Sequence, residues 1–329
     1  MIRKWIAAAL CALLLMSVLA GCGGPKTKQT DDNLSVVTTI FPVYDWVRQV
    51  AGDKAAVTLL LDNGVDLHSY QPTADDIVKI STCDVFVYVG GESDEWVDDV
   101  LRDAANPDLV VIDLLDALGD AVKEEEVVEG MEAEHDHDHE DHEEDHEEEG
   151  PEYDEHVWLS LKNAQTLCRA IAGGLAEADG DNADRYEQNA EAYCDKLKAL
   201  DEDYAQAVQD GTAKTLLFAD RFPFRYLTDD YGLNYYAAFV GCSAESEASF
   251  ETIVFLAGKV DELGLGTVLQ IESADGSIAR TVVENTKTKD QQILTLDSLQ
   301  SVTASEVEAG TTYLSVMESN LEVLRQALA

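Results

Sequence analysis

The sequence predicts an α/β protein with two lobes, each built on a parallel sheet, and a single long helix that joins them. Two observations carry this prediction. Short apolar segments alternate with amphipathic segments before residue 182 and again after residue 210, which indicates parallel strands with crossover helices. Between these halves, residues 182–210 place their larger apolar side chains at steps of four and three, the spacing of one helix face.

Residues 34–181 are expected to form the N-terminal lobe. A strand at 34–39 is followed by a helix whose first turn suits Pro42. Thr73 can cap a helix that runs to residue 80. The other predicted strands of this lobe cover 56–61, 84–89 and 109–112, and further helices are expected at 94–102 and from about Lys162.

Residues 182–210 are expected to form a rigid linker helix. Asp181 suits the N-cap, Gly211 suits the end of the helix, and neither Pro nor Gly interrupts it. At about 1.5 Å per residue the helix is roughly 40 Å long, about the width of a domain. It could instead lie along one lobe. The similar order of strands and helices on both flanks favours a strut between two lobes.

Residues 211–329 are expected to form the C-terminal lobe. The predicted strands cover 214–219, 234–239, 267–272 and 291–296, and the predicted helices cover 222–231, 247–263, 277–285 and 305–327. Residues 40–44 (IFPVY) and 221–225 (RFPFR) occupy equivalent places in the two halves. We therefore expect two Rossmann-like lobes with a cleft between them.

The first residues have the pattern of an export signal. Arg3 and Lys4 precede an apolar run at 5–18, and residues 19–22 (LAGC) form a lipobox in which Cys22 becomes the lipidated first residue of the mature chain. The apolar run is shorter than the roughly 20 residues that span a bilayer, which argues against a transmembrane anchor. We expect a signal peptide at 1–21, a lipidated tether at 22–33, and an extracytoplasmic protein anchored to the cell membrane.

The charge balance favours cations as partners. Asp and Glu number 66 against 22 Lys and Arg, for a formal net charge of −44. Such a surface argues against nucleic acid or anionic lipid headgroups as partners. The hydrophobic content of 46% is enough for the cores of two domains.

Four cysteines remain once Cys11 is assigned to the signal and Cys22 to the lipid. Cys168 and Cys194 lie at nearly equal distances from the predicted turn at 179–182, so they would face each other on an antiparallel helix pair. An exported compartment permits disulfides. A bridge between Cys168 and Cys194 is one expectation, and buried free thiols are the other.

Residues 124–155 are almost wholly acidic. Five histidines lie among the carboxylates: His135, His137, His139, His142 and His146. Such a segment cannot bury a core, so a mobile loop is expected. Neutral imidazole binds zinc and its neighbours, and carboxylates add attraction and further ligands. Histidines at this spacing favour weak metal collection at several sites over a purely solvating loop.

The two remaining histidines predict a separate site. His68 follows the second strand, His156 ends the acidic segment, and Asp220 and Glu272 end strands of the second half. In open α/β sheets, ligands bind beyond the carboxyl ends of the strands. Two imidazoles from one lobe can therefore meet two carboxylates from the other, which predicts one divalent transition-metal site in the cleft.

Three segments resemble the zinc and manganese solute-binding lipoproteins of bacterial ABC importers, solute-binding family 9. They are residues 68–73 (HSYQPT), 154–159 (DEHVWL) and 226–233 (YLTDDYGL), and the acidic His-rich insertion is typical of the zinc-type members. The resemblance covers essentially all of the mature chain. It implies one rigid helix between two lobes, one Zn²⁺ or Mn²⁺ in the cleft, and His68, His156 and Glu272 as ligands. It also implies an ABC permease as partner and a monomer.

The chain departs from this family at Arg221, where a third histidine is usual. Arg stays protonated and has no lone pair to donate, so it cannot be a ligand. Asp220 replaces the imidazole, or a water completes a site with three protein ligands, or the ligand set has changed. If Arg221 lines the cleft, we expect a salt bridge to Asp220 or Glu272; otherwise it points to solvent.

The sequence favours a membrane-tethered lipoprotein that captures Zn²⁺ and passes it to an ABC permease, without catalysing a reaction. Two other functions stay open. Two histidines, a carboxylate and a water also describe the site of a metal-dependent hydrolase, although no spare general base is evident. An extracellular metal buffer or adhesin that has no permease partner is the other.

Overall fold

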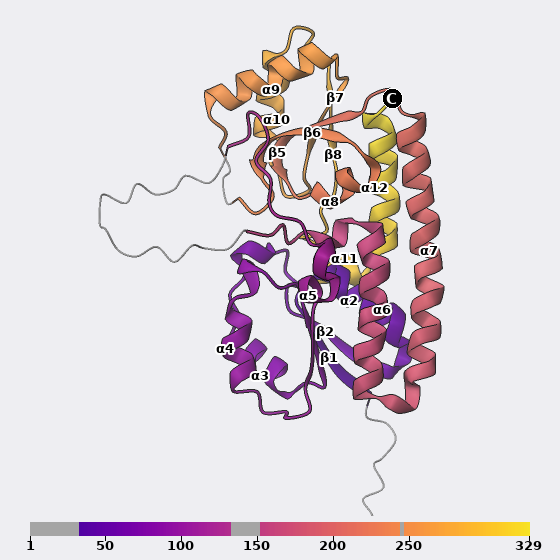
Figure 1. Cartoon of the computed structure of the whole chain (residues 1–329). Helices are drawn as coiled ribbons and strands as arrows, with labels where there is room; N and C mark the ends of the chain where they lie inside the picture. The colour runs from indigo at the N-terminus through magenta and orange to yellow at the C-terminus, as the bar shows by residue number, and fades with distance from the viewer. Residues whose placement is uncertain (1–32, 133–151, 244–246) are drawn as a thin grey trace, which may run out of the picture. The chain divides into compact units, whose positions relative to one another are not determined.

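The computed structural model describes residues 33–132, 152–243 and 247–329, and residues 33–329 form one compact unit. Two four-stranded parallel sheets lie within this unit (Figure 1). The first contains β1 (Leu34–Thr38), β2 (Ala55–Leu59), β3 (Val85–Tyr88) and β4 (Val110–Asp113), and the second contains β5 (Thr215–Phe222), β6 (Asn234–Val240), β7 (Thr267–Gln270) and β8 (Gln292–Thr295).

The N-terminal sheet has the strand order β2-β1-β3-β4. Val36 of β1 and Val85 and Phe86 of β3 are fully buried, as expected for the central strands of a parallel sheet with helices on its faces. The helices of this lobe are α2 (Phe41–Ala51), α3 (Ala74–Thr82), α4 (Trp96–Arg102), α5 (Leu114–Leu118) and α6 (Leu161–Ala178). Thr73 caps α3 as predicted and forms a capping box with Asp76.

The C-terminal sheet repeats the same order, as β6-β5-β7-β8. Its lobe contains α8 (Arg225–Tyr231), α9 (Phe250–Leu263) and α10 (Ser277–Asn285). The sequence predicts a helix from residue 222, but Phe222 pairs with Val240 of β6 and remains in β5. Arg221 therefore lies in a strand and does not open a helix.

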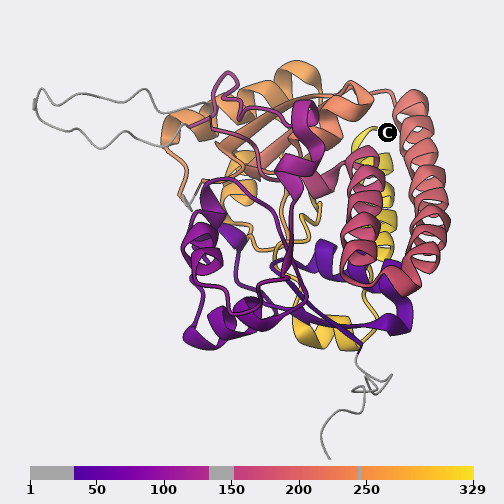
Figure 2. The same cartoon turned by 60° about the horizontal axis from the view of Figure 1, so that its bottom comes forward.

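The long helix α7 (Ala183–Asp210) joins the lobes, which confirms the predicted strut. The hydroxyl of Tyr193 donates to Asp45 of α2 at 3.4 Å, and the hydroxyl of Tyr204 donates to the carbonyl of Met317 at 2.7 Å. Met317 belongs to α12 (Tyr313–Ala327) in the C-terminal part of the chain. Figures 1 and 2 both show α6 and α12 alongside α7.

The predicted helix at 305–327 is two helices, α11 (Ala304–Glu308) and α12, separated at Gly310, whose φ of 100° is incompatible with a helix.

The end of the chain also contacts the N-terminal lobe. The carboxylate of Asp45 accepts the backbone N–H of Tyr313 at 3.0 Å, and the indole N–H of Trp158 donates to the carbonyl of Ser298 at 2.8 Å. These buried hydrogen bonds supplement the connection that α7 provides.

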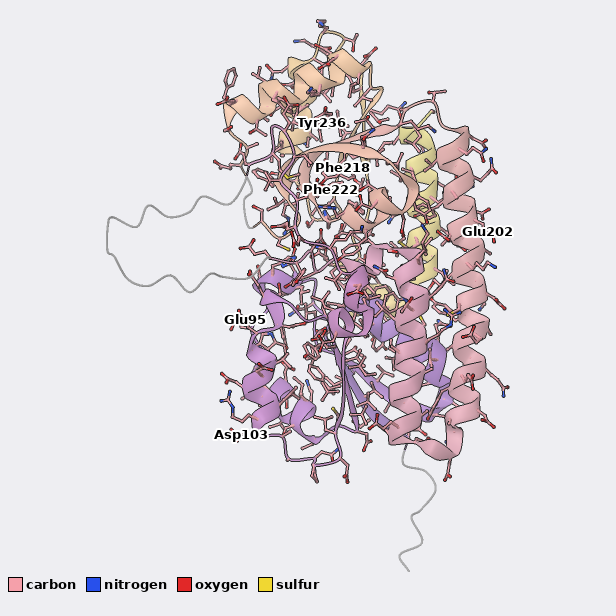
Figure 3. All side chains as sticks on the ribbon, in the orientation of Figure 1. Glu95, Asp103, Glu202, Phe218, Phe222 and Tyr236 are labelled. Atoms are coloured by element: carbon pink, nitrogen blue, oxygen red, sulfur yellow. The ribbon has the colours of Figure 1, made fainter. Side chains whose placement is uncertain are left out.

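Apolar and charged side chains separate as the sequence pattern predicts (Figure 3). Phe218 and Phe222 are buried in the C-terminal lobe, whereas Glu95, Asp103 and Glu202 are exposed. No helix within the described ranges 33–132, 152–243 and 247–329 is long and apolar enough to cross a membrane. The predicted signal peptide and the lipidated Cys22 lie outside the described residues.

The predicted disulfide between Cys168 and Cys194 is not formed in the structure. Both side chains are buried free thiols, on α6 and α7 respectively. The thiol of Cys194 donates to the backbone carbonyl of Gln165, one turn before Cys168 on α6, at 3.4 Å. Burial raises the pKa of both thiols, which keeps them protonated and unreactive.

Candidate metal centre

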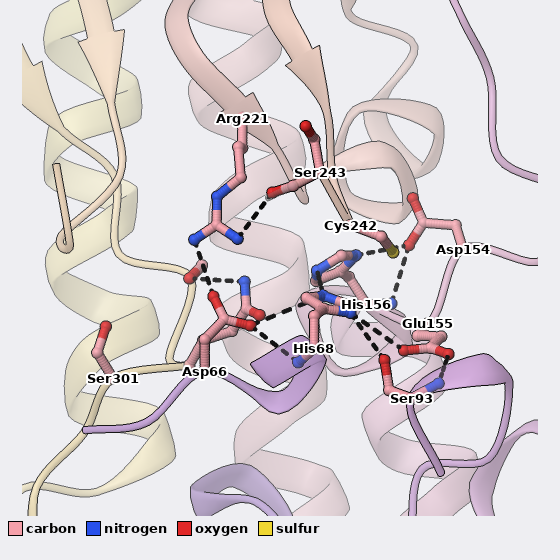
Figure 4. Close-up of polar contacts among 12 residues, drawn as sticks. Asp66, His68, Ser93, Asp154, Glu155, His156, Arg221, Cys242, Ser243 and Ser301 are labelled. Carbon is pink, nitrogen blue, oxygen red and sulfur yellow. Dashed lines mark hydrogen bonds and ion pairs between the residues drawn. The ribbon is translucent and has the colours of Figure 1, made fainter. Parts of the chain in front are cut away.

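Two histidines of the N-terminal lobe face each other at the cleft. His68 lies in a single turn of 3₁₀ helix, Leu67–Ser69, and the carboxylate of Asp66 fixes that turn by accepting the backbone N–H of His68 at 3.1 Å. His156 immediately precedes a second such turn, Val157–Leu159. Their Nε2 atoms are 3.2 Å apart (Figure 4). The structure thus brings together the two histidines that the sequence singled out.

The other nitrogen of each ring is held by an oxygen. Nδ1 of His68 lies 2.8 Å from Oγ of Ser93, and Nδ1 of His156 lies 3.0 Å from a carboxylate oxygen of Asp154. A ring that donates its Nδ1–H in this way keeps the lone pair of Nε2 for a metal. Without a proton or a cation between them, the lone pairs of the two Nε2 atoms would face and repel each other at 3.2 Å.

The nitrogen separation fits a bound zinc ion. Zn–N bonds of about 2.0–2.1 Å at a tetrahedral angle put two ligand nitrogens about 3.4 Å apart. The observed 3.2 Å between the Nε2 atoms of His68 and His156 is close to that value. The pair can therefore chelate a metal without a large rearrangement of the N-terminal lobe.

Burial and charge determine the protonation of this pair. Burial and the neighbouring His156 lower the pKa of His68 to about 3, so His68 is a neutral imidazole. Burial alone would lower the pKa of His156 as well, but the Asp154 carboxylate, its hydrogen bond and the charge of Glu155 together raise it. The carboxylates thus stabilise positive charge where the two Nε2 atoms meet.

A cysteine of the C-terminal lobe completes a group of three ligand side chains. Cys242 follows β6, and one ligand atom from each of His68, His156 and Cys242 lies within 4.8 Å of the other two. Burial, together with the charges of Asp154 and Glu155, raises the pKa of this thiol. Cys242 is not among the ligands that the sequence predicts. Its position just after a strand, like that of His68, is the signal that would have found it.

The two carboxylates that the sequence predicts as ligands are engaged elsewhere. The oxygens of Asp220 accept the backbone N–H groups of Arg221 and Ile271 at 2.8 and 3.2 Å. Those of Glu272 accept the backbone N–H and hydroxyl of Ser298 and the hydroxyl of Ser301, at 2.7–2.9 Å. The structure does not bring either carboxylate into the ligand group, because these partners hold them within the C-terminal lobe.

Arg221 crosses the cleft to a different partner from the predicted ones. Its guanidinium bonds to the carboxylate of Asp66 at 2.8 Å and to the backbone carbonyl of Ser243 at 3.3 Å. The prediction of a side-chain salt bridge to Asp220 or Glu272 is therefore wrong. Burial opposes ionisation of Asp66, but the charge of Arg221 and the hydrogen bonds from Arg221 and from the backbone N–H of His68 outweigh it and lower the pKa of Asp66.

An acidic cavity of about 220 Å³ adjoins the ligand group. His68, Cys242 and four glutamates, Glu92, Glu125, Glu152 and Glu155, contribute to its lining. One oxygen of Glu155, Oε2, is buried without a hydrogen-bond partner among the described residues and lies 3.5 Å from Nδ1 of His68. A buried carboxylate oxygen in that state favours a cation in the cavity. The five histidines at 135–146 lie outside the described residues.

Comparison with known proteins identifies the family. The model of the ZnuA family, described as the periplasmic zinc-uptake complex component A, matches residues 36–327. The zinc-binding lipoprotein AdcA of Streptococcus pneumoniae serotype 4 is 35% identical over 319 residues, which are 97% of this chain but 59% of that protein. The high-affinity zinc uptake system protein ZnuA of Bacillus subtilis is 31% identical over 332 residues, which are 100% of this chain and 99% of that protein.

Solved structures agree with this assignment. The Zn(II)-bound ZnuA-like domain of Streptococcus pneumoniae AdcA has a TM-score of 0.70 at 31% identity, over 90% of this chain and 99% of that one. The metal-dependent lipoprotein YcdH of Bacillus subtilis has a TM-score of 0.72 at 26% identity, over 90% and 99%. The names of these relatives describe metal binding and uptake, and none describes a catalysed reaction. The chain belongs to the ZnuA family of zinc-uptake components.

Proposed function

We propose that this chain is the zinc-binding component of an ABC-type importer. It binds one Zn²⁺ between its lobes and passes it, chemically unchanged, to a membrane permease. The observation that carries the proposal is the pair of imidazoles whose Nε2 atoms lie 3.2 Å apart. His68 and His156 are the ligands that the N-terminal lobe contributes, and Ser93 and Asp154 orient them.

Zinc is the cargo that the donor atoms favour. Imidazole nitrogen suits Zn²⁺, whereas Mn²⁺ prefers carboxylate, carbonyl and water oxygens. Asp220 and Glu272, the carboxylates that would favour Mn²⁺, are bound within the C-terminal lobe and lie outside the ligand set that we propose. The family description and the names of the relatives support the same metal.

Location and partners follow from the same proposal. A chain lipidated at Cys22 is held at the outer face of the cell membrane, where a permease is within reach. A single copy is sufficient, because both lobes that flank the site come from one chain. In this proposal the acidic segment at 124–155 collects cations at its histidines, and Glu125, Glu152 and Glu155 of the same segment line the acidic cavity.

Zinc titration in competition with a chelator tests the proposal. The metal-free full-length protein is expected to bind one Zn²⁺ tightly and Mn²⁺ more weakly. A double variant, His68→Ala with His156→Ala, is expected to lose the tight site and keep the weak ones. The function is refuted if the parent binds no Zn²⁺ tightly or if the double variant binds it equally well.

Delivery to a permease requires a test in cells. Cells that lack this gene are expected to take up less radioactive zinc when a chelator limits the free metal, and the parent gene is expected to restore uptake. A gene that carries both alanine substitutions is expected not to restore it. Unchanged uptake in the deletion strain would instead support an extracellular metal buffer without a permease.

A further inference from the structure

The C-terminal lobe brings one sulfur atom to the two imidazoles. Sγ of Cys242 belongs to the group whose ligand atoms lie within 4.8 Å of one another, and Figure 4 shows the side chain beside the ring of His156. We propose that Cys242 is the third protein ligand of the metal and binds it as a thiolate. This inference rests on the proposed zinc-binding function and names the residue through which the second lobe takes part.

Other cleft side chains of the C-terminal lobe are unsuitable or engaged. Both carboxylate oxygens of Asp220 accept backbone N–H groups, and both oxygens of Glu272 accept hydrogen bonds from serines. Arg221 is a cation bound to Asp66. Among the described residues of this lobe, Cys242 therefore can reach the metal without giving up a carboxylate hydrogen bond.

The backbone before Cys242 passes very close to His156. A Cβ atom at Gly241 would lie 2.9 Å from Cε1 of His156 and 3.0 Å from the backbone carbonyl oxygen of Phe222. The contact with His156 is shorter than real Cβ atoms make and the contact with Phe222 is tighter than most of them, so a side chain at 241 would separate the strand end from the imidazole. Glycine at this position lets the chain pass over the ring and deliver the next residue to the site.

The distances require only a small movement. Zn–N bonds of about 2.0–2.1 Å and a Zn–S bond of about 2.3 Å give a tetrahedral edge of about 3.6 Å between nitrogen and sulfur. The ligand atoms of the group are already within 4.8 Å. The sulfur therefore has to approach by no more than about 1.2 Å, a movement that draws the C-terminal lobe towards the N-terminal one. As the Zn–S bond forms, the thiol proton leaves to solvent.

The cavity and the ligand type determine the rest of the site. The adjoining space of about 220 Å³ has room for a water as the fourth ligand, since a water occupies about 30 Å³ in the liquid.

A soft thiolate favours Zn²⁺ and disfavours Mn²⁺, which prefers oxygen ligands. Cys242 is thus a residue that determines metal specificity.

Cobalt substitution tests the sulfur directly. Co²⁺ bound by thiolate has a sulfur-to-metal charge-transfer band in the near ultraviolet, which a site of nitrogen and oxygen ligands lacks. We expect this band when one equivalent of Co²⁺ is added to the full-length metal-free protein. We expect Cys242→Ser to lose it and to bind Zn²⁺ more than about 100-fold more weakly, beyond the loss typical when a residue that only orients a metal ligand is changed. Cys168→Ser, which alters a buried thiol away from the site, is the matched control and should keep both.

The outcomes separate this inference from the proposed function. If Co²⁺ binds the parent without the band, or if Cys242→Ser retains the band, Cys242 is not a ligand, although the histidine site stands. If the parent binds neither Co²⁺ nor Zn²⁺, both proposals fail. Alkylation of the parent protein, read by peptide mass spectrometry, does not depend on the folding of a variant. Stoichiometric Zn²⁺ should slow alkylation of Cys242 at least tenfold, and an unchanged rate would overturn the inference.

Discussion

Replacing Asp154 by asparagine is expected to weaken Zn²⁺ binding about tenfold while the fold is retained. One carboxylate oxygen of Asp154 accepts both the backbone N–H and the Nδ1–H of His156, at 2.8 and 3.0 Å. The side chain is only 4% exposed, so water cannot take over its role. Asparagine has the same size and keeps one acceptor oxygen, but it removes the negative charge that strengthens the imidazole as a ligand.

The magnitude follows from the type of hydrogen bond. A hydrogen bond to a charged group contributes about 1.5–3 kcal/mol, and one between neutral groups contributes about 0.5–1.5 kcal/mol. The substitution therefore removes about 1–1.5 kcal/mol of the support that His156 receives as a ligand. A free-energy change of about 1.4 kcal/mol is a factor of 10 in Kd. This agrees with the 10–100-fold losses found when groups that orient metal-bound histidines are changed.

The assay is a Zn²⁺ titration of the Asp154→Asn variant against a chromogenic chelator, with urea unfolding as the check on stability. Asp45→Asn is the matched control, because Asp45 is another buried aspartate but bonds to Tyr193 and Tyr313, away from the metal centre. The control should bind Zn²⁺ like the parent. Equal affinity in the parent and Asp154→Asn, or an equal loss in the control, would refute the assigned role of Asp154.

Three further predictions concern the strand end, a buried carboxylate and the acidic segment. Gly241→Ala should lower Zn²⁺ affinity at least tenfold, because the new Cβ would lie 2.9 Å from His156; Gly173→Ala, which meets no neighbour within 4 Å, should not change it in the same titration. Burial and the charge of Glu272 raise the pKa of Asp297 in the folded protein to about 6, whereas its pKa in the unfolded chain is about 3.9. The folded protein therefore opposes ionisation of Asp297, and the free energy of unfolding should fall as pH rises from about 4 to 6. Urea unfolding should therefore find Asp297→Asn more stable than the parent at pH 7, by about 1–3 kcal/mol, and no such gain at pH 4; an equal difference at both pH values would contradict this cause. Deleting residues 134–149 should remove the weak metal sites seen by calorimetry and preserve the tight one, and loss of the tight site would place its ligands in that segment.

The sequence predicts the fold well because most of its signals are local. The stripe of apolar residues on α7 is buried as its spacing requires, and the cap at Thr73 forms where its residue type predicts it. The boundary at residue 222 is missed, because the pairing of Phe222 with Val240 decides it and that partner is distant in sequence. The break at Gly310 is missed within an otherwise helical pattern.

The site is predicted only in part, because several of its contacts join residues that are distant in sequence. His68 and His156 stand out because imidazoles are rare in the described part of the chain and both lie at the ends of elements. The partners of Glu272 are serines that lie 26 and 29 residues further along, so nothing near Glu272 in the sequence shows that its oxygens are occupied. In the sequence Cys242 resembles the other cysteines, and only its place after β6 points to the cleft.

The placement of both imidazoles on one lobe determines the order of events in metal binding. Both come from the N-terminal lobe, and Ser93 and Asp154 of that same lobe fix their orientation. Their mutual spacing is therefore independent of how far the cleft is open. With the ligands that we propose, the N-terminal lobe alone can hold an incoming ion as a bidentate chelator, and the second lobe then slows its dissociation. A permease that separates the lobes would meet an ion held by the two imidazoles alone, which is released more easily than one held by both lobes.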